Sequence, residues 1–279
     1  MHSRDRLEQA FVLHRRDYAN TSLLIEVFSG PSGRFAAIAK GAKRGRSPTA
    51  VLLQPFTPLW LSWSGRGEVR TLARVEAAGA ALTLPGKAVY CGFYLNELLM
   101  RLLGRHDPHE DLFAFYHAAL ARLALGTDLE APLRQFELRL LQDTGYALDL
   151  EREWDTGRPV VAGRRYRYEP ERGMRAATSP EEGLTVSGEA LLALAAGEAL
   201  SGVPAREARG LMRAALAPYL GPRPLRSREL FQQSGGASKA PPLHELNNED
   251  QSSTNERKSS EPSSRQDAGT LGQGRYPAG

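Results

Sequence analysis

The hydrophobic pattern of the first 80 residues is typical of short β-strands. Thr21–Phe28 is rich in β-branched and aromatic residues and ends at the turn-forming segment Ser29–Gly33. Arg34–Lys40 is apolar again and can return from that turn as the second arm of a hairpin. Phe11–His14 and Glu68–Val75 are two further candidates. The pattern therefore predicts a β-rich unit at the N-terminal end.

Two details shape this prediction. Val51–Trp63 is long and apolar but contains Pro55 and Pro58, so we expect it to be bent or partly unpaired. Glu68–Val75 alternates, and regular alternation places these residues on one face: Val69, Thr71, Ala73 and Val75. Five strands in about 70 residues, joined by Gly-rich turns, favour a small closed barrel of the five-stranded OB type.

After Leu84–Gly86 the apolar positions recur at steps of three and four residues, which predicts helices. The first helix carries this stripe: Tyr90, Phe93, Tyr94, Leu95, Leu98, Leu99, Leu102 and Leu103. A second begins near Asp107-Pro108 and reaches Leu125-Gly126, and a third runs from about Pro132 to Gly145. We expect a helical bundle packed against the barrel, and hence an α+β protein.

The C-terminal half is less regular. The stretch 151–186 shows only a short β-like piece at Arg164–Tyr168. Helices resume at Ser187–Ala196 and Ala205–Leu220, and Leu225–Phe231 is the last predicted ordered turn. We expect these parts: an OB-fold domain over 1–80, a helical domain over 81–150 and 187–232, an irregular insertion over 151–186, and a disordered polar tail over 233–279.

Charge is unevenly distributed along the chain. Residues 1–80 contain twelve Lys and Arg but six Asp and Glu, whereas the whole chain has a net charge of only +4. Lys40–Arg46 alone holds four cations and two glycines. Glycines let the backbone approach a polyanion, so this segment indicates a phosphate-binding surface. The alternative is a solvated loop with spare charge.

Cations and aromatic residues are interleaved throughout the predicted barrel. Phe11, Phe35, Trp60 and Trp63 could stack on bases, although small barrels also need large side chains in the core. Tyr18 differs because it lies in a polar loop. The candidate nucleic-acid contacts are Arg15, Arg16, Tyr18, Arg34, Lys40, Lys43, Arg44, Arg46, Arg66, Arg70 and Arg74.

A second candidate site lies on the third predicted helix. Leu133, Phe136 and Leu140 share one face, and Arg134 lies beside that stripe. A cation at the rim of an apolar groove suits a peptide that ends in hydrophobic and acidic residues. The candidate contacts are Arg134, Phe136 and Arg139. The alternative is a pair between Arg134 and Glu137 on a solvated surface.

Signals for an enzyme are weak. No phosphate loop, catalytic triad or pair of carboxylates in apolar surroundings is found. His106 and His109 could hold a metal ion, but a helix-capping segment is the commoner explanation. The single Cys91 suits a reducing cytoplasm. We also see no apolar stretch long enough to span a bilayer and no secretory signal. We predict a cytoplasmic protein without a cofactor or metal.

Nine short blocks carry a family resemblance over about residues 7–232. They are Ala10–His14, Asn20–Leu24, Ala39–Ala42, Leu53–Pro58, Tyr94–Leu98, Leu133–Glu137, Gly145–Asp149, Pro218–Leu220 and Ser227–Phe231. In this order they resemble the RecO family of DNA repair and recombination mediators.

The resemblance implies an OB-fold followed by a helical domain, and a non-enzymatic, nucleoid-associated function. Such a mediator binds single- and double-stranded DNA, anneals complementary strands and, with RecR, helps load RecA onto DNA coated by the single-stranded-DNA-binding protein. The acidic tail of that coat protein is expected to dock on the helical domain, with Arg134 as the implied contact. Some relatives carry a four-cysteine zinc module, but 151–186 contains no cysteine.

Two other function classes stay open at this point. A protein adaptor would use its basic barrel to bind acidic partner surfaces, without functional contact to DNA. A nuclease would need clustered Asp, Glu or His for metal ions, and the basic segment is poor in carboxylates.

Overall fold

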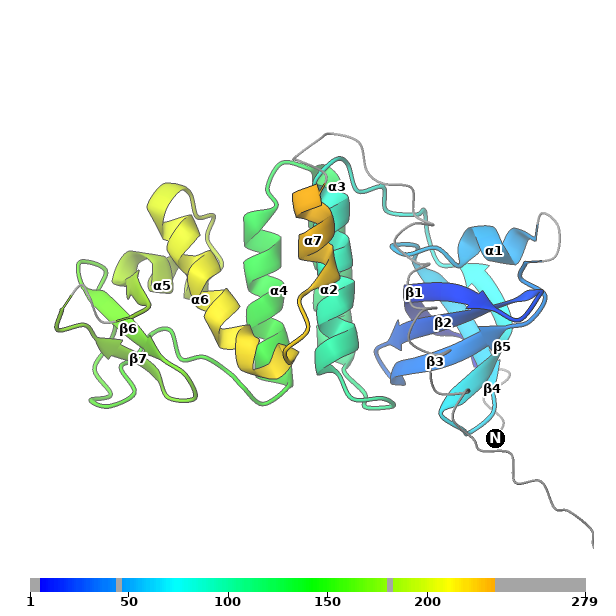
Figure 1. The fold of residues 1–279 in the computed structure, drawn as a ribbon, viewed down its shortest axis with the longest axis horizontal. Helices are drawn as coiled ribbons and strands as arrows, with labels where there is room; N and C mark the ends of the chain where they lie inside the picture. The colour runs from blue at the N-terminus through cyan, green and yellow to red at the C-terminus, as the bar shows by residue number, and fades with distance from the viewer. Residues whose placement is uncertain (1–5, 44–46, 180–182, 234–279) are drawn as a thin grey trace, which may run out of the picture.

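The computed structural model describes residues 6–43, 47–179 and 183–233. A closed barrel occupies one end of an elongated molecule, helices form the middle, and a small sheet lies at the other end (Figure 1). The barrel strands are β1 (Glu8–Tyr18), β2 (Ser22–Ser29), β3 (Gly33–Ala39), β4 (Leu59–Ser64) and β5 (Val69–Ala77). Their order around the barrel is β1-β2-β3-β5-β4, with β3 and β5 parallel. The predicted OB-fold is confirmed.

The barrel interior follows from the two-residue period of its strands. Val12, Ile25 and Phe35 point inward from β1, β2 and β3 and are fully buried. Leu59, Leu61 and Trp63 complete this core from β4. Pro55 and Pro58 lie between helix α1 (Pro48–Leu52) and β4, which confirms that the segment around them is bent and partly unpaired.

Strand β5 departs from the regular alternation that its sequence predicted. Ser62 pairs with Arg74, but the neighbouring Trp63 pairs with Leu72, so one extra residue bulges out of β5. Leu72 and Val75 therefore both pack against the barrel core, whereas Val69 is exposed. The predicted common face of Val69 and Val75 is wrong because a bulge exchanges the two faces of the strand.

The helices form the body of the second domain. They are α2 (Ala88–Leu102), α3 (Glu110–Leu125), α4 (Glu130–Asp143), α5 (Gly188–Ala196), α6 (Gly202–Leu220) and α7 (Arg226–Gln233). In Figure 1, α2, α3 and α4 stand side by side and α7 lies against α2. None of the helices in the described residues is long and apolar enough to cross a membrane.

The stretch expected to be irregular contains a three-stranded antiparallel sheet. Its strands are β6 (Arg165–Glu169), β7 (Gly173–Ala176) and β8 (Thr185–Ser187), in the order β7-β6-β8. Tyr166, Met174 and Val186 are fully buried and continue the core of the helices. The β-like piece predicted at Arg164–Tyr168 corresponds to β6. The expectation that the rest of the insertion is irregular is corrected, because β7 and β8 are only four and three residues long and become recognisable only through their pairing with β6. The expected polar tail over 233–279 lies outside the described residues, apart from Gln233 at the end of α7.

The outer face of the barrel packs on α3. Phe11 and Phe28 are cross-strand partners on β1 and β2, and both side chains point away from the barrel interior. Phe11 meets Tyr116 edge-to-face at a centroid distance of 5.2 Å, and Phe28 meets Phe113 at 5.5 Å. Of the phenylalanines considered for the barrel core, only Phe35 is in it. Phe11 and Phe28 join the two domains.

A buried amide reinforces this contact. Asn96 Nδ2 on α2 donates to the carbonyl oxygen of Leu13 at 2.8 Å, and the Tyr116 hydroxyl donates to Asn96 Oδ1 at 2.6 Å. All three residues are at most 1% exposed. Since a buried polar group without a partner costs about 1–3 kcal/mol, the pairing of Asn96 fixes the position of β1 relative to α2.

We predict that Gly33→Ala destabilises the protein by about 3 kcal/mol. Gly33 has a φ of +65°, and a Cβ atom there would lie 2.0 Å from the carbonyl oxygen of Asp107, in the loop that connects α2 to α3. Gly86→Ala is the matched control, because Gly86 has a φ of +50° and no atom within 4 Å of the added carbon. The control should lose only about 1 kcal/mol in a denaturant titration. Equal losses would contradict the close contact at Gly33.

Candidate nucleic-acid interface

Two loops meet at one end of the barrel and bring several predicted contacts together. The Lys43 amide donates to the carbonyl oxygen of Thr21 at 3.0 Å, which holds the end of β3 against the β1–β2 turn. Lys43 Nζ also lies 2.6 Å from Asp17 Oδ2. Tyr18 is the last residue of β1 rather than a loop residue, and it is 47% exposed. Lys40, Lys43 and Tyr18 form what we call the hairpin end. Arg44 and Arg46, which follow in sequence, lie outside the described residues.

Arg15 has a structural role that its sequence position does not reveal. Its Nη1 donates to the carbonyl oxygen of Ala50 at 3.1 Å and lies 3.5 Å from that of Leu53, so it holds α1 against the barrel. Burial lowers the pKa of Arg15, and the nearby charge of Asp17 opposes this shift. These carbonyls engage the Arg15 guanidinium, so Arg15 is less available for the predicted DNA contact than an exposed, unpaired cation.

Arg34 is likewise engaged within the protein. Nη2 donates to the carbonyl oxygen of Leu103 at the end of α2 at 2.9 Å, and Nη1 lies 3.2 Å from Glu26 Oε2. Burial lowers the pKa of Arg34, against the opposing charge of Glu26. Arg105 binds the other oxygen of the same carboxylate at 2.5 Å. Arg34 therefore joins β3 to the helical domain, which leaves it less available for the predicted DNA contact.

Arg70 covers the aromatic residues that could otherwise have stacked on bases. Its guanidinium lies 4.3 Å from the Phe35 ring centroid and 5.2 Å from that of Trp63. Its Nη2 lies 2.9 Å from Nδ1 of His106. Burial lowers the pKa of Arg70. This cluster closes the barrel next to the α2–α3 loop, so base stacking on Phe35 or Trp63 is corrected to internal packing. Trp60 is half-buried, outside the barrel core.

The remaining barrel cations differ in whether an acidic side chain pairs with them. Arg74 is exposed and lies 2.6 Å from Glu76 Oε1. Arg66 is exposed in the β4–β5 turn, Arg16 is exposed on β1, and Lys40 is exposed after β3. Within the described part of the chain, Arg16, Lys40 and Arg66 have no acidic partner. The charges of these three are therefore unpaired, whereas the exposed Lys43 and Arg74 each share theirs with a carboxylate.

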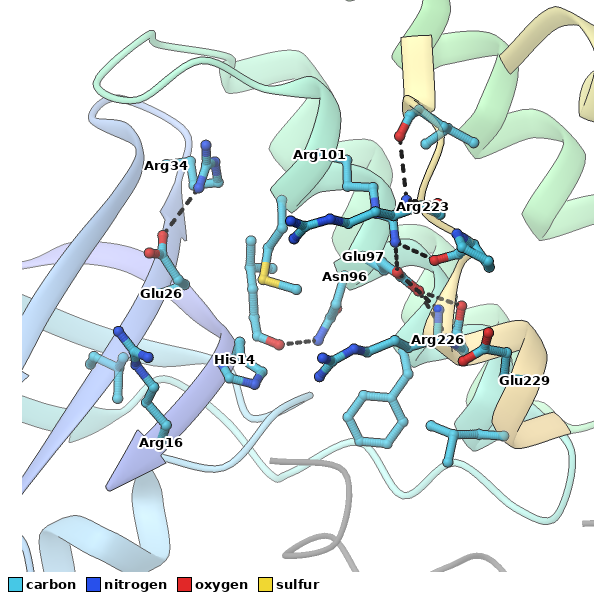
Figure 2. A pocket seen from close by; sticks show the side chains of 18 of the residues that line it. His14, Arg16, Glu26, Arg34, Asn96, Glu97, Arg101, Arg223, Arg226 and Glu229 are labelled. Carbon is cyan, nitrogen blue, oxygen red and sulfur yellow. Dashed lines mark hydrogen bonds and ion pairs between the residues drawn. The ribbon is translucent and has the colours of Figure 1, made fainter. Parts of the chain in front are cut away.

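A cleft of about 820 Å³ lies between the barrel and the helices (Figure 2). One wall is the outer face of β1, β2 and β3, and it carries Arg16, Glu26 and Arg34. The other wall is formed by α2 and by the segment from the end of α6 into α7, which contributes Arg223 and Arg226. In Figure 2 both of these arginines extend toward the barrel wall. The cleft is therefore bordered by cations of both domains.

The cations of the helical wall were not among the predicted contacts. Arg101 on α2, Arg223 and Arg226 all line the cleft, although they are far apart from the barrel in sequence. The available signal was the run from Arg223 to Arg228, which places three arginines around a proline. This run of arginines indicates a binding surface only once the fold places it across the cleft from the cations of the barrel.

The two candidate histidines serve different purposes. His106 faces Arg70, whereas His109 directly precedes α3, and its amide donates to the carbonyl oxygen of Gly30 at 2.9 Å. Across the described ranges, no three His, Cys, Asp or Glu side chains gather in a way that could hold a metal ion. The pair is thus used in joining the α2–α3 loop to the barrel.

Known proteins similar to this chain cover both of its domains. Two family models match it: "Recombination protein O N terminal" over residues 2–81 and "Recombination protein O C terminal" over residues 86–229. DNA repair protein RecO of Nitrosospira multiformis is 48% identical over 232 residues, covering 82% of this chain and 96% of the relative. The chain belongs to the RecO family. RecO of Methylococcus capsulatus is 48% identical, covering 83% and 95%, and RecO of Halorhodospira halophila is 49% identical, covering 81% and 96%.

In this RecO-family chain the predicted peptide site on α4 is mostly internal. Phe136 is 1% exposed and packs against Tyr116, so its prediction as a surface contact is corrected. Arg134 Nη2 donates to Glu137 Oε1 at 2.8 Å, and that oxygen also accepts from the Tyr94 hydroxyl at 2.6 Å. Burial raises the pKa of Glu137. The Arg134–Glu137 pair exists, but it is buried rather than solvated.

Arg139 is half-buried, and its Nε pairs with Asp143 Oδ1 at 2.8 Å. Its guanidinium lies 4.9 Å from the ring centroid of Phe115, which is 41% exposed, and 3.0 Å from Asp111 Oδ2. Arg134 borders a small pocket that also contains Glu130 and Glu198, and these carboxylates would repel an acidic ligand. The structure therefore does not bring Arg134 and Arg139 together into one site.

We predict that the Arg70–His106 contact weakens in acid. Burial, together with the charges of Arg70 and Arg105, lowers the pKa of His106 below its ordinary 6.5, with Glu68 opposing. Between the folded-state pKa and 6.5 the unfolded chain binds more protons, so stability is present above pH 6.5 and falls as the pH drops toward the folded-state pKa. His106→Asn tolerates the left-handed φ of 62° and should flatten this slope in unfolding experiments from pH 7.5 to 5. An unchanged slope would exclude His106 as its source.

Proposed function

We propose that this chain is a recombination mediator that binds single- and double-stranded DNA, anneals complementary strands and, with RecR, helps load RecA onto DNA coated by the single-stranded-DNA-binding protein. Membership in a family of DNA repair proteins supports the proposal. The observation that carries it is the presence of three exposed barrel cations, Arg16, Lys40 and Arg66, without acidic partners in the described residues.

Annealing can proceed from this charge alone. Two complementary strands repel each other through their phosphates, and cations that neutralise these phosphates release condensed counterions and lower the repulsion. The exposed ring of Tyr18 at the hairpin end can stack on a base and keep it unpaired until its complement arrives. No bond is made or broken in this process, so the proposed activity needs neither a catalytic group nor a cofactor.

The structure divides the predicted contacts into two groups. Arg15, Arg34 and Arg70 are engaged inside the protein, as described above. The proposed DNA contacts are therefore Arg16, Tyr18, Lys40, Lys43, Arg66 and Arg74, together with Arg44 and Arg46 from the undescribed part of the loop.

We predict that Lys40→Gln with Lys43→Gln weakens single-stranded DNA binding and slows annealing. Each lost phosphate contact lowers the slope of log K against log salt by about 0.7, so the double variant should lose about 1.4. Arg206→Gln with Arg213→Gln is the matched control, because it removes two exposed cations from α6. Fluorescence anisotropy with labelled oligonucleotides gives the slope, and annealing of complementary strands is timed with and without coat protein.

Two outcomes would change the proposal. If the wild-type protein ignores oligonucleotides even at low salt yet binds its protein partners, it is an adaptor for acidic protein surfaces. If the hairpin-end variant and the α6 variant lose the same slope, the positive charge acts through the net charge of the chain and not through a surface on the barrel.

We also propose that the acidic tail of the coat protein docks on the helical domain near Arg139 and Phe115. Arg139→Glu should weaken binding of a synthetic acidic, hydrophobic C-terminal peptide by about 1–2 kcal/mol, since it replaces a cation by a like charge. Arg122→Glu on the exposed side of α3 is the control, and it should leave the affinity unchanged. Isothermal titration of both variants measures the difference. Equal affinities for the wild type and Arg139→Glu would remove this surface from the site.

A further inference from the structure

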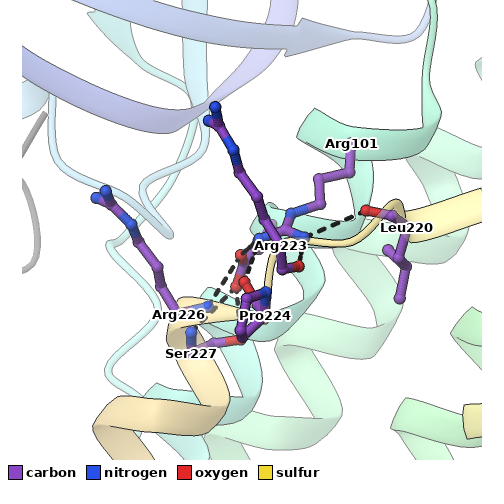
Figure 3. Close-up of polar contacts among 7 residues, drawn as sticks. Arg101, Leu220, Arg223, Pro224, Arg226 and Ser227 are labelled. Atoms are coloured by element: carbon purple, nitrogen blue, oxygen red, sulfur yellow. Dashed lines mark hydrogen bonds and ion pairs between the residues drawn. The ribbon is translucent and has the colours of Figure 1, made fainter. Parts of the chain in front are cut away.

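The segment that joins α6 to α7 is held firmly against α2. Arg101 donates to the carbonyl oxygens of Leu220, Arg223 and Pro224, at 3.3, 2.5 and 2.6 Å (Figure 3). Arg101 also pairs with Glu97, one turn earlier on α2, at 2.6 Å. These contacts use the backbone of the segment, so its side chains are left to point elsewhere.

Glu97 completes the attachment from the other side. Its carboxylate accepts from the amides of Arg226 and Ser227, both at 3.0 Å, and from the Ser227 hydroxyl at 2.8 Å. A carboxylate at a helix N-terminus satisfies amides that have no partner within the helix. Glu97 and Arg101 are therefore positioning residues that determine where Arg223 and Arg226 lie.

The attached segment directs these arginines across the cleft. In Figure 3 the side chains of Arg223 and Arg226 extend from the segment toward the barrel. Arg223 is exposed and has no acidic partner within the described ranges, and the same holds for Arg16 on the opposite wall. The acidic residues Glu26 and Glu97 in the cleft are already paired, with Arg34 and Arg101 respectively. Glu229 on α7 also lines the cleft, so cations outnumber carboxylates on each wall: Arg16 and Arg34 against Glu26, and Arg101, Arg223 and Arg226 against Glu97 and Glu229.

Arg16, which lines the cleft, lies close to the hairpin end along β1. Arg16 and Tyr18 are two residues apart on β1 and share its outer face, at a separation of about 6.6 Å. Arg16 therefore lies between the residues of the hairpin end and the remaining residues of the cleft wall. A continuous row of cations with an exposed aromatic ring suits an extended polyanion with stacking bases better than a compact anion.

From this geometry we infer that the interdomain cleft is a second nucleic-acid site, in which one DNA strand passes from the hairpin end between Arg16 and Arg223. The inference rests on the proposed function and adds a path for the strand. The apolar side chains of Phe93, Met100 and Leu230 line the same cleft and offer surface for bases. The part of the strand inside the cleft is shielded from solvent by the two walls. The part along the hairpin end stays exposed and can pair with a complementary strand.

The test uses the full chain and a labelled thymidine 30-mer. Arg16→Gln and Arg223→Gln should each lower the slope of log K against log salt by about 0.7, and the double variant by about 1.4. Arg206→Gln on α6 is the control, because it removes one exposed arginine that does not line the cleft. Thermal unfolding of each variant verifies that the fold is intact.

A second measurement locates the strand directly. A 30-mer containing 5-iodouracil should form photocross-links to β1 and also to the segment 220–230. If wild-type protein binds the 30-mer while Arg223→Gln keeps its affinity and slope, or if cross-links stay on the barrel, the cleft path is wrong and the proposed function stands. If the variants lose only affinity for a polyglutamate peptide, the cleft binds acidic protein. Failure of the wild-type protein to bind any oligonucleotide would instead overturn the proposed function.

Discussion

The relative position of the barrel and the helices depends on a buried contact between β1, α2 and α3. Phe11 and Phe28 bury their rings against Phe113 and Tyr116, while Asn96 joins the backbone of Leu13 to the Tyr116 hydroxyl. Aromatic packing supplies most of the attraction, and the amide gives it one geometry. The same face of the barrel becomes a wall of the cleft a few residues further along each strand. Function at the cleft therefore depends on a contact that never reaches the solvent.

The arginines of this protein fall into two groups, those that bind other parts of the chain and those that remain unpaired at the surface. Arg15, Arg34 and Arg101 donate to backbone carbonyls and join segments that are distant in sequence. Such guanidinium groups stabilise the fold because five donors in a planar fork can serve several acceptors at once. Arg16 and Arg223 make no such contacts in the described structure. Only the cations that remain unpaired after these internal contacts form a basic surface that can bind an anion. The total number of cations does not define that surface.

The buried charges of the helical domain are also paired within the protein. Glu137 is 1% exposed, and it is accompanied by Arg134 and by the Tyr94 hydroxyl. Removing one member of a buried ion pair leaves an uncompensated charge, at a cost of about 3–5 kcal/mol. The sequence block around Arg134 is consequently explained by packing between α2 and α4. Arg134 can therefore belong to the Leu133–Glu137 block because of its buried pair with Glu137, and not only because of a contact with a partner.

Much of the architecture could be predicted because it is local. The two-residue period of β2 and β3, the turn at Ser29–Gly33 and the apolar stripe of α2 each depend on neighbours in sequence. Strands β7 and β8 and the bulge in β5 could not be predicted, because pairing with a neighbouring strand decides each of them. The nine sequence blocks were likewise sufficient to indicate the family.

What the sequence by itself determined is a basic OB barrel followed by helices, since strand periodicity, helix periodicity and local charge are properties of consecutive residues. Only the tertiary structure decided which cations are available. Arg34 and Arg16 look equivalent in the sequence, yet Arg34 binds Leu103 and Glu26, while Arg16 has no acidic partner among the described residues. The reason is physical: the hydrogen bond from Arg34 to Leu103 joins residues 69 positions apart, and the cleft joins residues about 200 apart, so only the folded chain brings them within the few ångströms over which they interact.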